Sequence, residues 1–331
     1  MKHIFLLFSV VLLTFFSGCS SSKQVFEPKK IESEWKHCDD NDVELKDVTS
    51  DVALLSNNKV LTKNKLLDVE VKEPFRVLSQ SDGWVISSTV DGKLKLQAIS
   101  NKDVEEFELK KTIATASVDG DTLAVLFADN EMAIYRLSDK KLLFKEMGGS
   151  SYANDTRIVK PFFMRGLAIF STLDGKIVIV DLKKNKRLRS AIVSSKNFFN
   201  NIIYFRLIDN KIVSATGSKI YSLSKRQERE KYEARYVTDD GKNIYLATKQ
   251  GEIVWLNSSL VENKKVKFPF AHFLGLIVNG TNVYALEKEG YLIVLSKDLE
   301  SYKIYEVELD DGKTFVAEDR FYTADKVIYV K

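Results

Sequence analysis

A pair of β-rich runs joined by a tight turn recurs along most of this chain, and this repeat constrains the fold more than any other feature. Successive turns lie 34 to 45 residues apart, with an average near 39. That period matches the four-stranded blades of a propeller and is too long for leucine-rich repeats. The turns carry residues that tolerate positive φ: Asp91-Gly92, Asp174-Gly175, Gln250-Gly251 and Glu289-Gly290, with Asp129-Asn130 and Asn57-Asn58 as weaker cases.

Two further strands accompany each hairpin. A run before the hairpin, such as residues 113–121, predicts an inner strand, and a charged run after it, such as residues 186–193, predicts the outermost strand. The middle strands are apolar almost throughout, which is typical of strands covered on both faces. No window of ten or more residues has a 3.6-residue period, so helices are not expected. The predicted fold is an all-β propeller of four-stranded antiparallel blades.

The number of hairpins favours eight blades, if the faint copy that begins at Asp51 is counted. Seven blades are the alternative, if that copy only completes the last blade. Residues 327–331 read as a third strand, so we expect residues 43–48 to supply the fourth strand and close the ring. The predicted organisation is a signal peptide over residues 1–18, a lipidated tether over residues 19–42 and a propeller domain over residues 43–331.

The start of the chain reads as an export signal. Lys2 precedes an apolar run, residues 4–16, which as a helix would span about 20 Å, short of the ~30 Å hydrocarbon core. A positive start, a short apolar run and small residues at its end are typical of a secretory signal peptide. The sequence F-S-G-C at residues 16–19 resembles the lipobox of bacterial lipoproteins, which implies lipidation of Cys19. An ordinary secreted protein with a conventional cleavage site is the alternative.

The predicted lipid on Cys19 implies a membrane location. One acyl chain gives marginal binding, whereas two or more give stable attachment at about 0.8 kcal/mol per buried CH₂. Ser20 resembles the residue that permits export to the outer membrane, so we expect an anchored protein at its periplasmic face. If Cys19 is lipidated, Cys38 has no disulfide partner, and the core must stabilise the domain alone.

The hairpins also carry a family resemblance. Residues 172–182 read T-L-D-G-K-I-V-I-V-D-L, and residues 89–99 echo them; this pattern is similar to the repeat of quinoprotein-dehydrogenase-like (PQQ-repeat-like) propellers. Within that superfamily, a lipidated propeller without catalytic apparatus resembles the BamB-like outer-membrane lipoproteins. The resemblance implies a periplasmic scaffold for protein–protein contacts, with a component of the outer-membrane β-barrel assembly machinery as partner. The tryptophans that close quinoprotein repeats are missing, because Trp35, Trp84 and Trp255 lie at non-equivalent places.

No pattern in the sequence predicts an enzyme. The chain lacks G-x-S-x-G, H-E-x-x-H and phosphate-loop motifs, and neither His37 nor His272 follows a nucleophile motif. The cluster at residues 37–40 is too compact for a tetrahedral metal site. We therefore expect no catalytic residue, no cofactor and no metal. A formal charge of +4 is too small to argue for a nucleic-acid partner.

Three basic runs follow the third strands of successive repeats, at residues 183–189, 225–231 and 264–267. Protection of exposed sheet edges is the plainer interpretation. The alternative is a positive rim that faces an acidic partner or anionic headgroups, with Lys184, Arg187 and Arg189 as candidate contacts.

Two other functions stay open at this point. One is a ligand-binding or enzymatic propeller that uses its central channel, and the other is a surface-exposed, adhesin-like lipoprotein.

Overall fold

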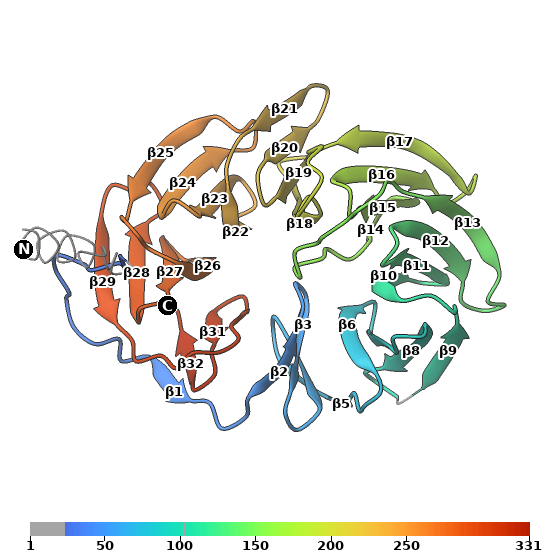
Figure 1. Ribbon diagram of the computed structural model, residues 1–331, viewed down its shortest axis with the longest axis horizontal. Coiled ribbons are helices and arrows are strands. Elements are labelled where there is room, and N and C mark those ends of the chain that lie inside the picture. Colours follow the sequence, from blue (N-terminus) through green and yellow to red (C-terminus); the bar gives the residue numbers. More distant parts are fainter. Residues whose placement is uncertain (1–23, 102) are drawn as a thin grey trace, which may run out of the picture.

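The described chain forms a ring of blades around a central channel (Figure 1). The computed structural model describes residues 24–101 and 103–331, which form eight four-stranded antiparallel sheets. The predicted hairpins supply the middle strands of these sheets. An eight-bladed all-β propeller is therefore confirmed, and the seven-blade alternative is wrong, because the faint hairpin after Asp51 belongs to a complete blade. In the described residues no helix has the length and apolar character needed to cross a membrane.

The first four blades follow one another along the chain, and each runs from an inner strand at the channel to an outer strand at the rim (Figure 1). Their strands are β2 (Leu45–Val48), β3 (Val52–Leu55), β4 (Lys59–Thr62) and β5 (Leu66–Glu70); β6 (Arg76–Ser81), β7 (Trp84–Ser88), β8 (Lys93–Ala98) and β9 (Val104–Glu108); β10 (Ile113–Asp119), β11 (Thr122–Phe127), β12 (Glu131–Arg136) and β13 (Leu142–Met147); and β14 (Phe162–Met164), β15 (Leu167–Ser171), β16 (Lys176–Asp181) and β17 (Lys186–Ile192).

The next three blades repeat this order, and the eighth is assembled from both ends of the described chain. Their strands are β18 (Ile202–Ile208), β19 (Lys211–Thr216), β20 (Ile220–Leu223) and β21 (Gln227–Glu230); β22 (Ala234–Asp239), β23 (Asn243–Thr248), β24 (Glu252–Asn257) and β25 (Glu262–Lys267); β26 (Phe273–Asn279), β27 (Asn282–Glu287), β28 (Tyr291–Ser296) and β29 (Tyr302–Glu306); and β30 (Phe315–Val316), β31 (Arg320–Tyr322), β32 (Lys326–Tyr329) and β1 (Cys38–Asp40).

The eighth blade closes the ring in the expected way but with a different segment. An N-terminal strand does complete the C-terminal blade; it is β1, whose Cys38 pairs with Ile328 in the antiparallel ladder. The expected closing segment near residues 43–48 is instead β2, the inner strand of blade 1. Leu45 suits the inner strand of blade 1 because its side chain is buried there. The strand that closes blade 8 is instead the charged edge strand β1, which needs only main-chain pairing with β32.

Part of the predicted tether is packed on the ring. Phe26 is buried and lies edge-on to Phe268 and Tyr291, with ring centroids 6.0 and 5.7 Å away. Trp35 donates a hydrogen bond from Nε1 to the Tyr329 carbonyl oxygen at 3.0 Å. Described residues of this segment, Phe26 and Trp35 among them, therefore pack on blades 7 and 8, and the division into signal peptide, tether and propeller stays a prediction.

The core lies between neighbouring blades, where the middle strands are covered on both sides. Leu94 and Leu96 of blade 2, for example, share a cluster with Leu123 and Val125 of blade 3, and all four side chains are fully buried. At the seam between the last blade and the first, Phe315 packs with the cluster that contains Leu45. Each blade thus depends on its neighbours for burial, which makes the closed ring a rigid platform for its loops.

Candidate functional site

The predicted site residues lie in different surroundings. Cys19 falls outside the described residues, so its lipidation stays a prediction. Arg187 is on β17, the outer strand of blade 4, and its Nη1 is 2.5 Å from the Glu146 carboxylate of blade 3. Lys184 lies 3.9 Å from Asp181 at the end of β16, and Arg189 is exposed on β17.

The three basic runs do lie on neighbouring blades, at the outer edges of blades 4, 5 and 6 (Figure 1). Carboxylates are interleaved with them, since β21 itself reads Q-E-R-E and Lys264 is 2.6 Å from Glu300. Part of the positive charge of this rim is therefore balanced by close neighbours. A partner-binding role for Lys184, Arg187 and Arg189 stays a prediction.

The central channel is the first of two hollows that could receive a ligand. Its cavity of about 670 Å³ is lined by inner strands and by the connection from blade 3 to blade 4, residues 148–161. This connection reaches across to blade 1, because Ser50 donates a hydrogen bond to the Ile158 carbonyl oxygen and Lys160 lies 2.8 Å from Asp51. The connection therefore crosses part of the channel.

Cations and carboxylates are nearly equal in number around this cavity. The lining cations are Lys63, Arg157, Lys160, Arg206 and Arg235, and the lining carboxylates are Asp51, Asp239, Glu318 and Asp319. Most of these cations have a carboxylate close by: Lys160 pairs with Asp51, Arg157 with Asp155, and Arg206 lies 3.9 Å from Asp239. Converging polar groups, which the sequence did not reveal, are thus present, and their main contacts are with one another.

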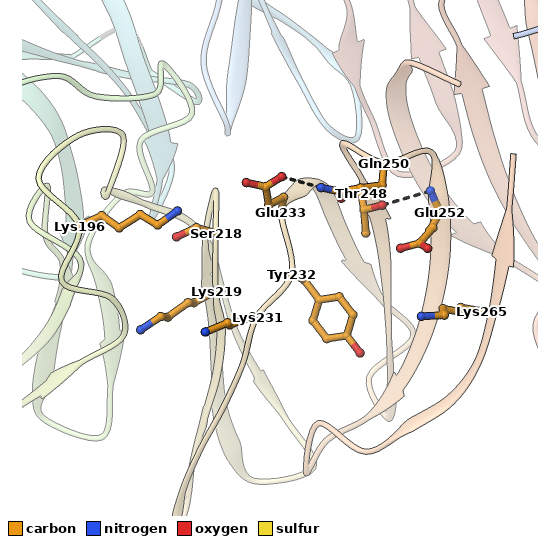
Figure 2. Close-up of a pocket in the computed structure, with 10 residues that line it drawn as sticks. All are labelled: Lys196, Ser218, Lys219, Lys231, Tyr232, Glu233, Thr248, Gln250, Glu252 and Lys265. Carbon is orange, nitrogen blue, oxygen red and sulfur yellow. Dashed lines mark hydrogen bonds between the residues drawn. The ribbon is translucent and has the colours of Figure 1, made fainter. Parts of the chain in front are cut away.

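The second hollow is a groove of about 470 Å³ between blades 5 and 6. Figure 2 shows Lys196, Lys219 and Lys231 along one side of it and Lys265 on the other, with Tyr232 between them. Four lysines and two carboxylates, Glu233 and Glu252, line this groove. The lining is therefore richer in positive charge than that of the channel.

Carboxylates near the groove accept hydrogen bonds from Gln250 and Tyr232 and do not pair with most of the lysines. Gln250 donates a hydrogen bond to the Glu233 carboxylate at 2.5 Å, and Tyr232 donates one to Glu262 at 2.7 Å. Burial, together with that hydrogen bond, raises the pKa of Tyr232, so its hydroxyl keeps the proton that it donates. Lys265 is 3.9 Å from Glu262. In the part of the chain that the structure describes, no carboxylate lies within ion-pair distance of the other three lysines.

The turn of blade 6 beside this groove has the backbone that its sequence predicts. Gly251 has a φ of 76°, and a Cβ at this position would collide with the Phe268 carbonyl oxygen. Glycine is therefore required there on both conformational and steric grounds. Lys196 and Lys219 were missed by sequence reasoning because each stands alone in its segment and only the fold brings them together; Lys231 ends one of the predicted basic runs.

No metal-binding cluster is found in residues 24–101 and 103–331, where no group of three or more His, Cys, Asp and Glu side chains could hold an ion. Burial raises the pKa of the Cys38 thiol to about 11. A thiol with that pKa is protonated at neutral pH, which makes it a poor nucleophile and metal ligand.

Comparisons with known proteins give one set of sequence relatives and many structural ones. No family model matches the chain. Two plasminogen-binding proteins PgbB of Helicobacter pylori, from strains J99 and 26695, are 29% and 28% identical to it over alignments that cover 99% of this chain and 70% of each relative.

The solved structures agree on the fold. BamB from Moraxella catarrhalis superposes with a TM-score of 0.66 over 89% of this chain and 98% of BamB, at 11% identity. Sqt1 of Saccharomyces cerevisiae gives a TM-score of 0.60 over 92% of this chain and 99% of Sqt1, at 10% identity. At such identities the likeness shows the fold alone: this chain is a BamB-like eight-bladed propeller.

Proposed function

We propose that this chain is a non-catalytic, protein-docking propeller, anchored by a lipid on Cys19 at the periplasmic face of the outer membrane. The observation that carries the proposal is the closed ring of eight mutually buried blades, which presents its connecting loops on a fixed frame. Rigid loops bind a protein without a large ordering cost, and propellers commonly serve as such platforms. Components of the outer-membrane β-barrel assembly machinery are the proposed partners, because the fold is that of BamB.

The packed N-terminal segment would limit the distance between the ring and a lipid on Cys19. Phe26 follows Cys19 by seven residues, and seven residues span at most about 25 Å when fully extended. Blades 7 and 8, which hold Phe26 and Trp35, would then stay close to the membrane surface. The loops of the other blades would be left to meet a partner.

Membrane fractionation and crosslinking test the proposal together. Wild-type chain should sediment with the outer membrane and crosslink to identified barrel-assembly components, whereas a Cys19→Ser chain should become soluble and lose those crosslinks. A protein that stays in the membrane after Cys19→Ser would contradict the anchor. Crosslinks that exclude every barrel-assembly component would contradict the proposed partners.

A second candidate function rests on the sequence relatives. Because proteins named for plasminogen binding match 99% of this chain, the ring could be displayed at the cell surface to bind a host protein. Intact cells should then bind added plasminogen, and external protease should remove the ring without lysis. If binding were unchanged in cells that lack the chain, or if the ring were protected from protease, this second function would be excluded.

A further inference from the structure

Three aromatic side chains stand exposed on two loops beside the lysine groove. The exposed fractions of Tyr152, Phe198 and Phe199 are 72%, 59% and 60%. Tyr152 lies on the connection before blade 4 and the phenylalanines lie on the connection before blade 5, and the rings of Tyr152 and Phe198 are 5.9 Å apart. Contiguous exposed apolar side chains of this size are typical of interaction sites.

These loops are held from beneath by buried asparagines. Asn200 donates hydrogen bonds to the carbonyl oxygens of Ser194 and Asp174, at 3.0 and 2.9 Å. Asn201 and Asp155 exchange two hydrogen bonds, at 2.7 and 3.1 Å, which join the two loops. Phe198 and Phe199 therefore project from a braced base, and their exposure is built into the fold.

The aromatic surface is continuous with the groove. The turn of blade 5 connects them, because a Cβ on Gly217 would lie 3.9 Å from the Phe199 carbonyl oxygen and the next two residues, Ser218 and Lys219, line the groove. Lys196 belongs to the same loop as the phenylalanines and also lines the groove. Tyr152, Phe198 and Phe199 together with Lys196, Lys219 and Lys231 form the docking surface.

The charge of the docking surface indicates what it would bind. Its three lysines have no carboxylate within ion-pair distance among the described residues, whereas three of the five cations that line the channel are paired: Lys160, Arg157 and Arg206. Unpaired cations beside exposed aromatic rings complement carboxylates that flank apolar side chains. A basic or neutral partner segment would gain nothing from the lysines.

We infer that the docking surface of blades 4 to 6 binds a partner protein through an acidic segment, whose carboxylates contact the lysines and whose apolar side chains cover the aromatic rings. This inference deepens the proposed function and rests on it. The lysines would mainly speed association and set specificity, and the rings would supply the apolar contact area.

A photo-crosslinking amino acid at position 198 of the full-length chain, in native membranes, tests the inference. Mass spectrometry of the captured protein should place the crosslink in a segment rich in Asp and Glu. Combined Lys196→Glu, Lys219→Glu and Lys231→Glu changes should lower the crosslink yield about tenfold, because three attractions become repulsions. A captured segment that is basic or neutral, or an unchanged yield, would overturn the inference.

Two controls separate this inference from the proposed function. Lys110→Glu, Lys141→Glu and Lys183→Glu make the same change in charge at exposed positions of blades 2 to 4 and should leave the yield unchanged. A crosslinker at Val90, a 69% exposed residue in the turn between β7 and β8 of blade 2, reports on another part of the ring. Partner capture at Val90 alone would overturn the docking surface but keep the docking function, whereas no capture at either position would overturn both.

Discussion

The channel and the docking surface both contain clustered cations, yet they differ in what those cations contact. In the channel, Lys160 and Arg157 reach carboxylates of the protein itself, one of them on blade 1. At the docking surface, Lys196, Lys219 and Lys231 reach none in the described chain. Paired charges that join distant segments stabilise a fold, whereas unpaired charges beside exposed rings leave binding energy for a partner. The channel should therefore matter for stability and the docking surface for capture.

The largest effect is expected when the ring that supports both regions is opened. Deletion of residues 320–331 removes β31 and β32, so β30 and β1 lose the strands that join them. We expect loss of the cooperative thermal transition, because every blade buries its core against neighbours. Circular dichroism would measure this transition. A truncated chain that melts like the intact one would show that ring closure contributes little.

The next effect concerns the channel alone. A Lys160→Ala change removes the ion pair with Asp51 and the contact with the Gln80 carbonyl oxygen. We expect the free energy of unfolding to fall by about 1–2 kcal/mol, since both partners are half-buried and charge-assisted hydrogen bonds are lost. Urea titration would measure it, with Lys183→Ala as an exposed control. A loss no larger than that of the control would mean that the Lys160–Asp51 ion pair contributes little to the free energy of unfolding.

A third effect concerns Asp174, which supports the connection that enters the channel and carries Tyr152. Its carboxylate accepts hydrogen bonds from Asn130 at 2.9 Å and from the Gly149 N–H at 3.2 Å. Burial raises the pKa of Asp174, but the bonds from Lys176, Thr172 and Asn130 outweigh burial and leave the pKa below its usual value.

The sign of the resulting pH dependence follows from that lowered pKa. The unfolded chain binds the proton more readily than the folded chain, so Asp174 stabilises the fold above its unfolded pKa of about 4 and loses this effect as pH falls. Asp174→Asn should lower stability at pH 7 and reduce the further loss below pH ~4. Denaturation at several pH values measures both. Parallel wild-type and variant curves would exclude this role.

A small effect on stability is expected at the docking surface. Phe198→Ser with Phe199→Ser removes exposed rings, so the free energy of unfolding should change by no more than about 0.5 kcal/mol. Partner capture should nevertheless fall, because the rings supply the apolar contact. A large loss of stability would instead assign the rings a structural role.

The smallest effect is expected at the outer rim. Replacing Lys184, Arg187 and Arg189 by Ala should change stability by less than about 0.5 kcal/mol, since exposed ion pairs contribute little. Capture at low salt should be nearly unchanged. A marked drop in capture would support the rim, and not the docking surface, as the partner site.

Most of the fold was predictable from the sequence, because turn residues and strand periodicity are local signals. The Asp-Gly and Gln-Gly turns located the hairpins, and their spacing gave the blades. The closing strand was misplaced because β1 reads C-D-D, a sequence of low strand propensity that is held only by pairing with β32. Local patterns do not report such long-range pairing.

The docking surface was far less predictable. Lys196 and Lys219 are 23 positions apart and line one groove only because the connection before blade 5 lies beside the β19–β20 turn. The one local signal was the pair Phe198-Phe199 in a polar segment, S-S-K-N-F-F-N-N, which is unusual for a solvent-exposed loop. The sequence does not show that Asn200 and Asn201 hold this loop by hydrogen bonds, and that contact is what makes the exposure of the two rings a fixed feature.

The most direct test compares the two regions in the same membranes. The Lys196→Glu, Lys219→Glu, Lys231→Glu chain and the Lys160→Ala chain would each be assayed for melting temperature and for crosslink yield from position 198. We predict that the lysine variant keeps its melting temperature and loses capture, while Lys160→Ala melts earlier and still captures the partner below its transition. The opposite pattern would contradict the account: the Lys160→Ala chain would lose capture of the partner, and the lysine variant would keep it.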